Sequence, residues 1–200
     1  MTQLVRPLQR NELATAAATL ALAFDDDPLF RFFVPAPARR NATLRWFHLS
    51  ALHECFAVGG ALTLTNGGPE AGAIALMPKG AWPRPLLSTL RAVALPRAFP
   101  TARLVRAGLH IESKIRSLHP PAPHVYVYLL GVHPARKGQG LGATLLRHAR
   151  HMSEQAGCVT HLETSNPVNL PFYRRFGFEI ATEITSHGGP PLWTMTTPNA

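Results

Sequence analysis

The segment HPARKGQGLG, residues 133–142, separates an apolar run, HVYVYLLGV (124–132), from ATLLRHARHMSEQAG (143–157). The apolar run predicts a buried strand, and the apolar residues of the following segment recur at helical spacing. A strand that enters a helix through such a loop leaves backbone N–H groups exposed at the positive end of the helix dipole. The segment therefore predicts a phosphate-binding loop built on three alternate glycines: Gly138, Gly140 and Gly142.

Two widespread phosphate-binding loops fit this segment poorly. A P-loop is excluded because no Lys-Ser or Lys-Thr pair follows the glycines. The pattern G-x-G-x-x-[GA] of dinucleotide-binding folds is met by Gly138, Gly140 and Ala143, and Glu163 ends the next predicted strand, where a ribose-binding acid belongs. Too few residues follow Glu163 to complete a doubly wound sheet, so NAD binding is a weak alternative.

A third type of loop matches better. KGQGLG (137–142) resembles the [QR]-x-x-G-x-[GA] pyrophosphate loop of GNAT-type N-acetyltransferases, although Lys137 stands where that family prefers Arg or Gln. LETSNPVNLPFYRRFGF (162–178) is similar to the family's C-terminal half-motif, in which an Asn follows the fifth strand and a Tyr precedes a Gly-Phe turn. With PLWTMTT (191–197), the chain resembles the puromycin N-acetyltransferase-like branch, closely over about 123–197.

The resemblance implies an α/β fold with a mixed central sheet, in which helices flank a parallel pair of strands that splay apart. It also implies acetyl-CoA as co-substrate, bound by the splayed strand, the glycine loop and two asparagines. These residues are Leu130, Gly131, Val132, Lys137, Gly138, Gln139, Gly140, Leu141, Gly142, Ala143, Asn166 and Asn169. The length of 200 residues and the 46% hydrophobic content favour one domain over 1–200.

Acetyl transfer needs an acid for the departing thiolate and a base for the amine. By resemblance, Tyr173 is the acid. The ordinary pKa of a phenol, near 10, is close enough to that of a thiol, about 8.5, for the phenol to give up its proton as the C–S bond breaks. Glu163 ends a predicted strand beside the expected site and could act as the base through water, or it could be a charge that faces solvent or helix dipoles.

The acceptor is predicted from DDDPLF (25–30), a loop that borders the acceptor site by family resemblance. Asp25, Asp26 and Asp27 would attract a cationic amine, or they could form a solvated turn before Pro28. Phe30 could line an apolar pocket or belong to the core. We expect a small-molecule amine. The alternatives are a protein or peptide amine, and a non-catalytic acyl-CoA-binding regulator.

The composition limits the classes of partner, metal and disulfide that we expect. The formal net charge is +9, with 17 Arg and 3 Lys, but no basic run exceeds two residues, so nucleic acid is not an expected partner. His148 and His151 have helical spacing without a nearby carboxylate or Cys, so we expect surface histidines and no metal. Cys55 and Cys158 lie among apolar neighbours and are expected to be buried free thiols.

The remaining elements follow from periodicity. We expect a strand at 3–8, helices at 12–24 and 38–57, and a hairpin of strands 60–65 and 71–78. A helix is expected within 79–122, ending before HPPAP. Strands are expected at 158–164 and 191–197, the latter in a hairpin with the strand that follows Gly177.

The stretch LATAAATLALAF (13–24) resembles a signal-peptide core. Its apolar residues recur at helical spacing, and Asn11 and Glu12 supply a helix N-cap and an acidic first turn, so a core helix is the preferred interpretation. The stretch is too short to span a membrane, which needs about 20 residues. We therefore expect a cytoplasmic protein without a membrane partner, either a monomer or a homodimer.

Overall fold

A computed structural model describes residues 4–81, 102–185 and 188–198. The strands are β1 (Val5–Pro7), β2 (Ala61–Leu64), β3 (Gly72–Met77), β4 (Val125–Val132), β5 (Thr160–Thr164), β6 (Glu179–Ile184) and β7 (Leu192–Thr196). The helices are α1 (Leu13–Ala23), α2 (Pro28–Phe33), α3 (Pro37–Ala57), α4 (Gly68–Ala71), α6 (Ala102–Leu118), α7 (Leu141–Gln155) and α8 (Leu170–Arg174). Single 3-10 turns cover Arg10–Glu12, Pro134–Arg136 and Pro167–Asn169.

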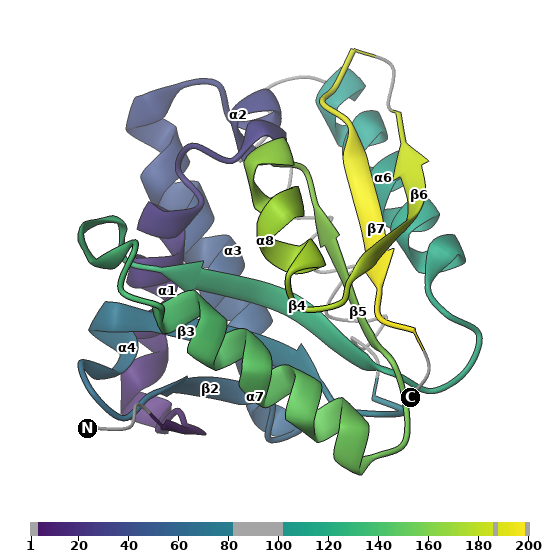
Figure 1. Ribbon diagram of the computed structural model, residues 1–200. Coiled ribbons are helices and arrows are strands. Elements are labelled where there is room, and N and C mark those ends of the chain that lie inside the picture. The colour runs from purple at the N-terminus through teal and green to yellow at the C-terminus, as the bar shows by residue number, and fades with distance from the viewer. Residues whose placement is uncertain (1–3, 82–101, 186–187, 199–200) are drawn as a thin grey trace.

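The strands of the described residues form one seven-stranded sheet in the order β1-β2-β3-β4-β5-β7-β6 (Figure 1). β4 and β5 are parallel, and the other neighbouring strands are antiparallel. The predicted mixed sheet with a parallel pair is confirmed, as are both predicted hairpins. β7 lies between β5 and β6, so the last strand pairs with two neighbours.

Alternate residues of the central strands contact helices on opposite faces of the sheet, as the two-residue period of a strand requires. Ile74 and Leu76 of β3 pack in a core with Leu145 of α7, whereas Ala73 and Ala75 pack in a second core with α1 and α3. Figure 1 shows α7 across one face and α1 and α3 behind the other. A third, smaller core joins α6 to α2, β6 and β7.

The parallel strands β4 and β5 separate after three residue pairs. Their register ends at Val127 and Leu162, although β4 continues to Val132. At the same point the register of β4 against β3 shifts, because Leu76 pairs with Val127 and Ala75 pairs with Leu129, which leaves Tyr128 as an extra residue. Such a bulge bends a strand and increases its twist. The expected splay is therefore present, and it begins at this bulge.

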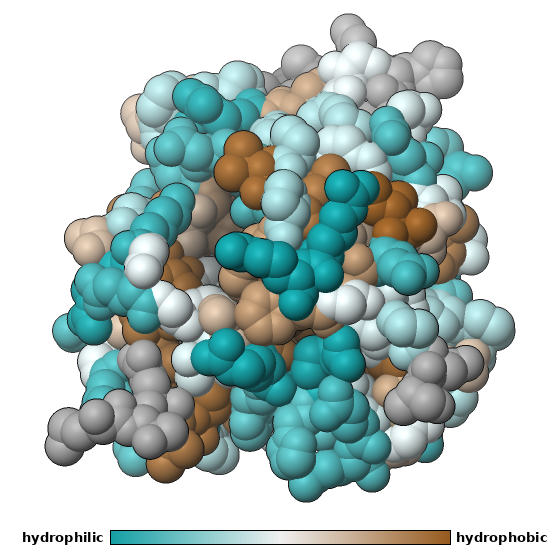
Figure 2. All heavy atoms as spheres, in the orientation of Figure 1, coloured by the Kyte–Doolittle hydropathy of each residue, from teal (hydrophilic) through white to brown (hydrophobic). Residues whose placement is uncertain are grey.

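The predicted helices are largely confirmed. α1, α3 and α7 agree with the expected ranges within about two residues, and α6 agrees with the helix expected before HPPAP, whose expected region also includes residues 82–101, outside the described residues. In Figure 2, hydrophilic side chains cover the outer face of α7, opposite its buried Leu145 and Ala149. No helix in the described parts of the chain is long and apolar enough to cross a membrane. Both cysteines are free thiols.

The start of α1 differs from the expectation. Asn11 is not the N-cap, because a 3-10 turn precedes the helix and Gln9 begins that turn. Gln9 and Glu12 form a capping box, in which the Glu12 side chain accepts a hydrogen bond from the Gln9 backbone N–H. Glu12 also accepts two hydrogen bonds from Arg6, at 2.7 and 2.8 Å, which join β1 to this turn.

We expect this ion pair to make stability depend on pH in the acid range. Hydrogen bonds from Arg6 lower the pKa of Glu12 from 4.5 to about 2. Its contribution is thus present above the unfolded pKa and is lost as the pH falls through the folded pKa. Because the pair is partly exposed, we expect Glu12→Gln to cost about 1 kcal/mol at pH 7, or roughly 2–4 °C in Tm.

Thermal unfolding followed by circular dichroism from pH 7 to pH 3 checks this prediction. The Tm difference between Glu12→Gln and the parent protein should be more than half lost by about pH 3. Glu179→Gln, at an exposed carboxylate of β6, is the control and should change Tm little at any pH. A Tm difference for Glu12→Gln that does not change with pH would contradict the prediction.

Candidate active site

A cavity of about 830 Å³ lies where β4 and β5 separate. Its walls come from β4, β5, α7, α8 and the loop between α1 and α2. Most of the residues predicted to bind acetyl-CoA line it: Leu130, Gly131, Val132, Lys137, Gly138, Gly140, Leu141, Gly142, Ala143, Asn166 and Asn169. Tyr173 and Glu163 also line it, as do Asp26, Asp27 and Phe30. Gln139 and Asp25 do not.

The glycine loop presents the start of α7 to this cavity. Gly140 is the N-cap of the helix and has a φ of +74°, in the left-handed region that favours glycine. A Cβ placed on Gly140 would meet no atom within 4 Å, so space for a ligand adjoins the backbone. The first N–H groups of an α-helix have no partner within the helix, and they carry its positive dipole end. The loop therefore fits a phosphate group.

Three cationic side chains line the cavity that the loop borders. Arg136, Lys137 and Arg175 line the cavity, and the side chain of Arg136 donates a 2.8 Å hydrogen bond to Gln139. The sequence motif indicated Arg136 and Lys137, but it gave no reason to expect Arg175. Arg175 comes from the end of α8 and lies over the ring of Phe172 at 5.8 Å.

Gly131 serves packing as well as the cavity. A Cβ at this position would lie 2.7 Å from Leu20 Cδ2 and 3.0 Å from Ala23 Cβ, both in α1. The sequence suggested that this glycine permits close approach of a ligand to the backbone. The structure shows that it also permits close approach of α1 to β4, so a side chain would displace the helix.

Tyr173 is a buried phenol at the cavity wall, placed by the short helix α8. Burial raises the pKa of Tyr173 well above its ordinary value, and the nearby negative charge of Asp27 raises it further. The phenol therefore keeps its proton at neutral pH. Its ring packs edge-on against Phe172 and Phe178, which holds the side chain in one orientation. A rigid phenol that retains its proton can donate a hydrogen bond to a group in the cavity, and can give up the proton when negative charge develops beside it.

Asn166 and Asn169 both have structural partners. The side chain of Asn166 caps the 3-10 turn after β5 by accepting a 3.1 Å hydrogen bond from the N–H of Val168. The amide nitrogen of Asn169 lies 3.5 Å from Thr164 Oγ1. The turn-forming role considered from the sequence is therefore present for Asn166, and both residues still border the cavity.

The end of the cavity nearest α1 and α3 is aromatic. Phe24, Phe30 and Phe47 line it, and the ring of Phe30 meets the other two edge-on. Behind them lies His48, which is fully buried, with its ring centroid 5.0–5.6 Å from those of the three phenylalanines. Burial lowers the pKa of His48 to about 3, so this wall carries no charge at neutral pH.

The three aspartates have different environments. Asp27 is the N-cap of α2 and accepts hydrogen bonds from the N–H groups of Leu29 and Phe30 and from the hydroxyl of Ser165. Burial raises the pKa of Asp27. Asp26 lines the cavity, whereas Asp25 lies 3.9 Å from Arg40, outside the cavity wall. The aspartates are therefore not a uniform solvated turn, because Asp27 holds α2 against the loop after β5.

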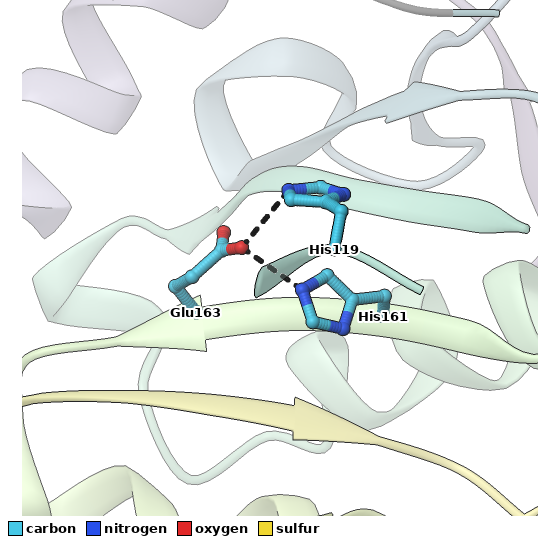
Figure 3. Close-up of side chains that lie close together, drawn as sticks. All are labelled: His119, His161 and Glu163. Atoms are coloured by element: carbon cyan, nitrogen blue, oxygen red, sulfur yellow. Dashed lines mark hydrogen bonds and ion pairs between the residues drawn. The ribbon is translucent and has the colours of Figure 1, made fainter. Parts of the chain in front are cut away.

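Glu163 belongs to a buried polar cluster. Its Oε1 lies 3.1 Å from His119 Nε2 and 3.0 Å from His161 Nε2, as Figure 3 shows. Its Oε2 accepts a 2.8 Å hydrogen bond from Tyr126. Although burial opposes ionisation, the two histidines lower the pKa of Glu163 to about 2. The carboxylate is thus charged at neutral pH and is a weak base.

The sequence analysis missed this cluster, because it weighed only His148 and His151 as metal ligands. One local signal was available: His161 and Glu163 are two residues apart on a strand and must share a face. Nothing local indicated His119, which follows α6.

The comparisons with known proteins agree with this geometry. The model of the acetyltransferase (GNAT) family matches residues 107–178, which include β4, the glycine loop, α7, β5 and Tyr173. This part of the chain is similar to that family. The chain also matches, over its full length, 98% of a Corynebacterium glutamicum structure described as histone acetyltransferase HPA2 and related acetyltransferase, with a TM-score of 0.71 and 24% identity, so the two share a fold.

Two other relatives show how far the likeness extends. The chain superposes over 100% of both chains on Drosophila melanogaster polyamine N-acetyltransferase, an enzyme that forms N-acetylagmatine, with a TM-score of 0.68 and 15% identity. It is 38% identical over 63 residues to mycothiol acetyltransferase of Mycobacterium sp. (strain JLS), a match that covers 28% of this chain and 21% of that protein. The matched segments span between 21% and 58% of the curated relatives' lengths. The puromycin N-acetyltransferase-like branch stays a prediction.

Proposed function

We propose that this chain is an acetyltransferase of the GNAT type, which moves the acetyl group of acetyl-CoA to the primary amine of a small molecule in a ternary complex. The observation that carries this proposal is the meeting of two features in one cavity: the start of α7 with its open glycine loop, and the buried phenol of Tyr173. A protein that only senses acyl-CoA needs the first feature and has no use for the second.

The residues along the cavity suit the parts of acetyl-CoA. The N–H groups at the start of α7, with Arg136, Lys137 and Arg175 nearby, would hold the pyrophosphate. Leu130, Gly131 and Val132 lie in the part of β4 beyond its pairing with β5, so their backbone groups on that side are available to the pantetheine arm. Asn166 and Asn169 stand at the opposite wall.

In the proposed reaction, a new N–C bond forms between the amine and the acetyl carbon, and the C–S bond breaks. Tyr173 donates its proton to the departing sulfur and recovers a proton from solvent. The amine must lose a proton as well. A carboxylate with a pKa of about 2 is a weak acceptor, so transfer to Glu163 is unfavourable. Neutral water is a weaker acceptor still, so we propose that the amine enters as the free base and that the proton lost after attack passes to a base of the bulk solvent.

A small amine with an apolar body suits the acceptor end. The walls there are aromatic, while Asp26 and Asp27 place carboxylates beside them. The likeness to Drosophila polyamine N-acetyltransferase supports an amine of low molecular mass. The likeness to the Corynebacterium structure, described as a histone acetyltransferase, supports the competing choice of a protein amine.

Calorimetric titration with acetyl-CoA, CoA and NAD, at one fixed salt concentration, tests the cofactor. We expect one equivalent of acetyl-CoA or CoA to bind and NAD not to bind. Fixed salt is needed because the net charge of +9 attracts anions non-specifically. Binding of NAD without acetyl-CoA would overturn the proposal.

Thiol release from acetyl-CoA then tests the acceptor. Agmatine, arylalkylamines and a lysine-containing peptide are compared at equal concentration. We expect release with at least one small amine and none with the peptide. Release with the peptide alone would favour the protein amine, and stoichiometric acetyl-CoA binding without release from any amine would favour a regulator.

A further inference from the structure

The cluster of His119, His161 and Glu163 has a use beyond the proposed acetyl transfer. His161 and Glu163 lie on one face of β5, and His119 reaches them from the segment between α6 and β4. The three side chains are 5%, 0% and 8% exposed, so the cluster is closed to bulk water. Two imidazole nitrogens and one carboxylate oxygen converge, all within 4.8 Å of one another.

This donor set is typical of zinc. Two His and one Glu with a fourth open position form a common catalytic zinc arrangement. With bond lengths of about 2.0–2.2 Å, tetrahedral coordination places ligand atoms about 3.3 Å apart. The distances from Glu163 Oε1 to the two Nε2 atoms, 3.0 and 3.1 Å, need to increase only slightly to admit an ion.

Each ligand is held by a further partner. His119 Nδ1 lies 2.9 Å from His124 Nε2, and His161 Nδ1 lies 2.8 Å from Thr196 Oγ1. Glu163 receives a hydrogen bond from Tyr126 through its other oxygen. Such outer contacts fix the orientation and tautomer of metal ligands.

The hydrogen bonds also determine the tautomer of His119. His124 Nδ1 lies 2.9 Å from the carbonyl oxygen of Ala122, which can only accept, so His124 Nδ1 donates. In a neutral His124 ring, Nε2 therefore accepts and His119 Nδ1 donates to it. A neutral His119 then directs an Nε2 lone pair toward the carboxylate of Glu163, whereas a protonated His119 donates a hydrogen bond to it. Two electron-rich atoms 3.1 Å apart require a positive charge between them.

We propose that His119, His161 and Glu163 bind one divalent cation of the zinc class. Zinc suits imidazole and carboxylate ligands, whereas calcium and magnesium prefer sets made of oxygen alone. The site lies directly behind the cavity wall, because Glu163 and Tyr126 line the cavity whereas His119 and His161 do not. The alternative to a metal ion between these three side chains is a proton on one of the two imidazole rings.

Titration of the full chain, purified without a histidine tag and dialysed against a chelator, tests the proposal. We expect one equivalent of ZnCl2 to bind by calorimetry, and CoCl2 to give the visible absorption of a tetrahedral cobalt site. Thermal unfolding should shift upward by roughly 5–10 °C at free zinc near 100 times Kd. These readouts do not depend on acetyl transfer, so a failed metal site and a failed enzymatic proposal are distinguishable.

Two ligand variants and one matched control locate the ion. His119→Gln and Glu163→Gln should each weaken zinc binding by more than about 100-fold, because loss of a ligand costs more than loss of an outer partner. The double variant His148→Ala/His151→Ala removes two histidines of α7 outside the cluster and should leave binding unchanged.

Two results would overturn the proposal. One is the absence of stoichiometric zinc binding in the parent chain, with no shift in Tm. In that case an imidazole of the cluster carries a proton in place of the metal ion. The other is binding that survives His119→Gln and disappears in the α7 double variant. If a ligand variant does not fold, the cobalt absorption of the parent chain decides between a tetrahedral site and a surface site.

Discussion

Tyr173→Phe should lower kcat by about 100- to 10,000-fold while leaving the dissociation constant of CoA unchanged. The phenol lines the cavity, and burial together with the charge of Asp27 raises its pKa, so it is protonated at neutral pH. Phe keeps the ring that packs against Phe172 and Phe178 and removes only the hydroxyl. The loss should therefore fall on the protonation of the thiolate and not on folding.

Steady-state kinetics with an amine found by thiol release, together with calorimetry for CoA, check this expectation. Tyr128→Phe is the matched control, because Tyr128 is a second phenol on the cavity wall. We expect it to keep kcat within about threefold. An unchanged rate in Tyr173→Phe would remove Tyr173 from the reaction. Equal losses in both variants would indicate that either phenol affects the cavity only through its shape.

Gly140→Val should weaken CoA binding by about 10- to 100-fold. The added Cβ projects into space that holds no protein atom within 4 Å, beside the N–H groups at the start of α7. A phosphate kept at a distance would lose at least one charge-assisted hydrogen bond, worth about 1.5–3 kcal/mol. The φ of +74° adds a strain of about 1–2 kcal/mol, which should also lower Tm.

Gly157→Val separates these two effects. Gly157 lies just past the other end of α7, has a φ of +59°, and would also place its Cβ where no atom lies within 4 Å. The two variants should lose similar stability, but only Gly140→Val should lose CoA affinity. Comparable CoA affinity in both variants, measured by calorimetry below the lower Tm, would show that the glycine loop does not contact the cofactor.

Much of the glycine-loop side of the cavity could be predicted because it is local in the sequence. Gly138 and Gly140 impose backbone conformations that few other residues adopt, and the flanking strand and helix follow from apolar periodicity. The family resemblance, and not local periodicity, placed Tyr173 near the loop. The side chain of Gln139 accepts a hydrogen bond from Arg136, a contact that the spacing of the motif does not predict, and its role in cofactor binding stays a prediction.

The acceptor side was less predictable. Asp25, Asp26 and Asp27 are consecutive, yet only the last two line the cavity, because Arg40 of α3 approaches the first. The position of β7 between β5 and β6 depends on pairing at both of its edges, which a hairpin prediction does not specify.

The sequence by itself determined the glycine loop and the helix that follows it, because both depend on residues close in the chain, while the order of strand, loop, helix and strand and the family resemblance indicated the parallel pair and the position of Tyr173. Only the tertiary structure decided the bulge at Tyr128 that separates β4 from β5, the presence of Arg175 on the cavity wall and the convergence of His119 on His161 and Glu163. These features depend on the packing of distant segments. Side-chain contacts across elements set the chemistry of the cavity, and no local period encodes them.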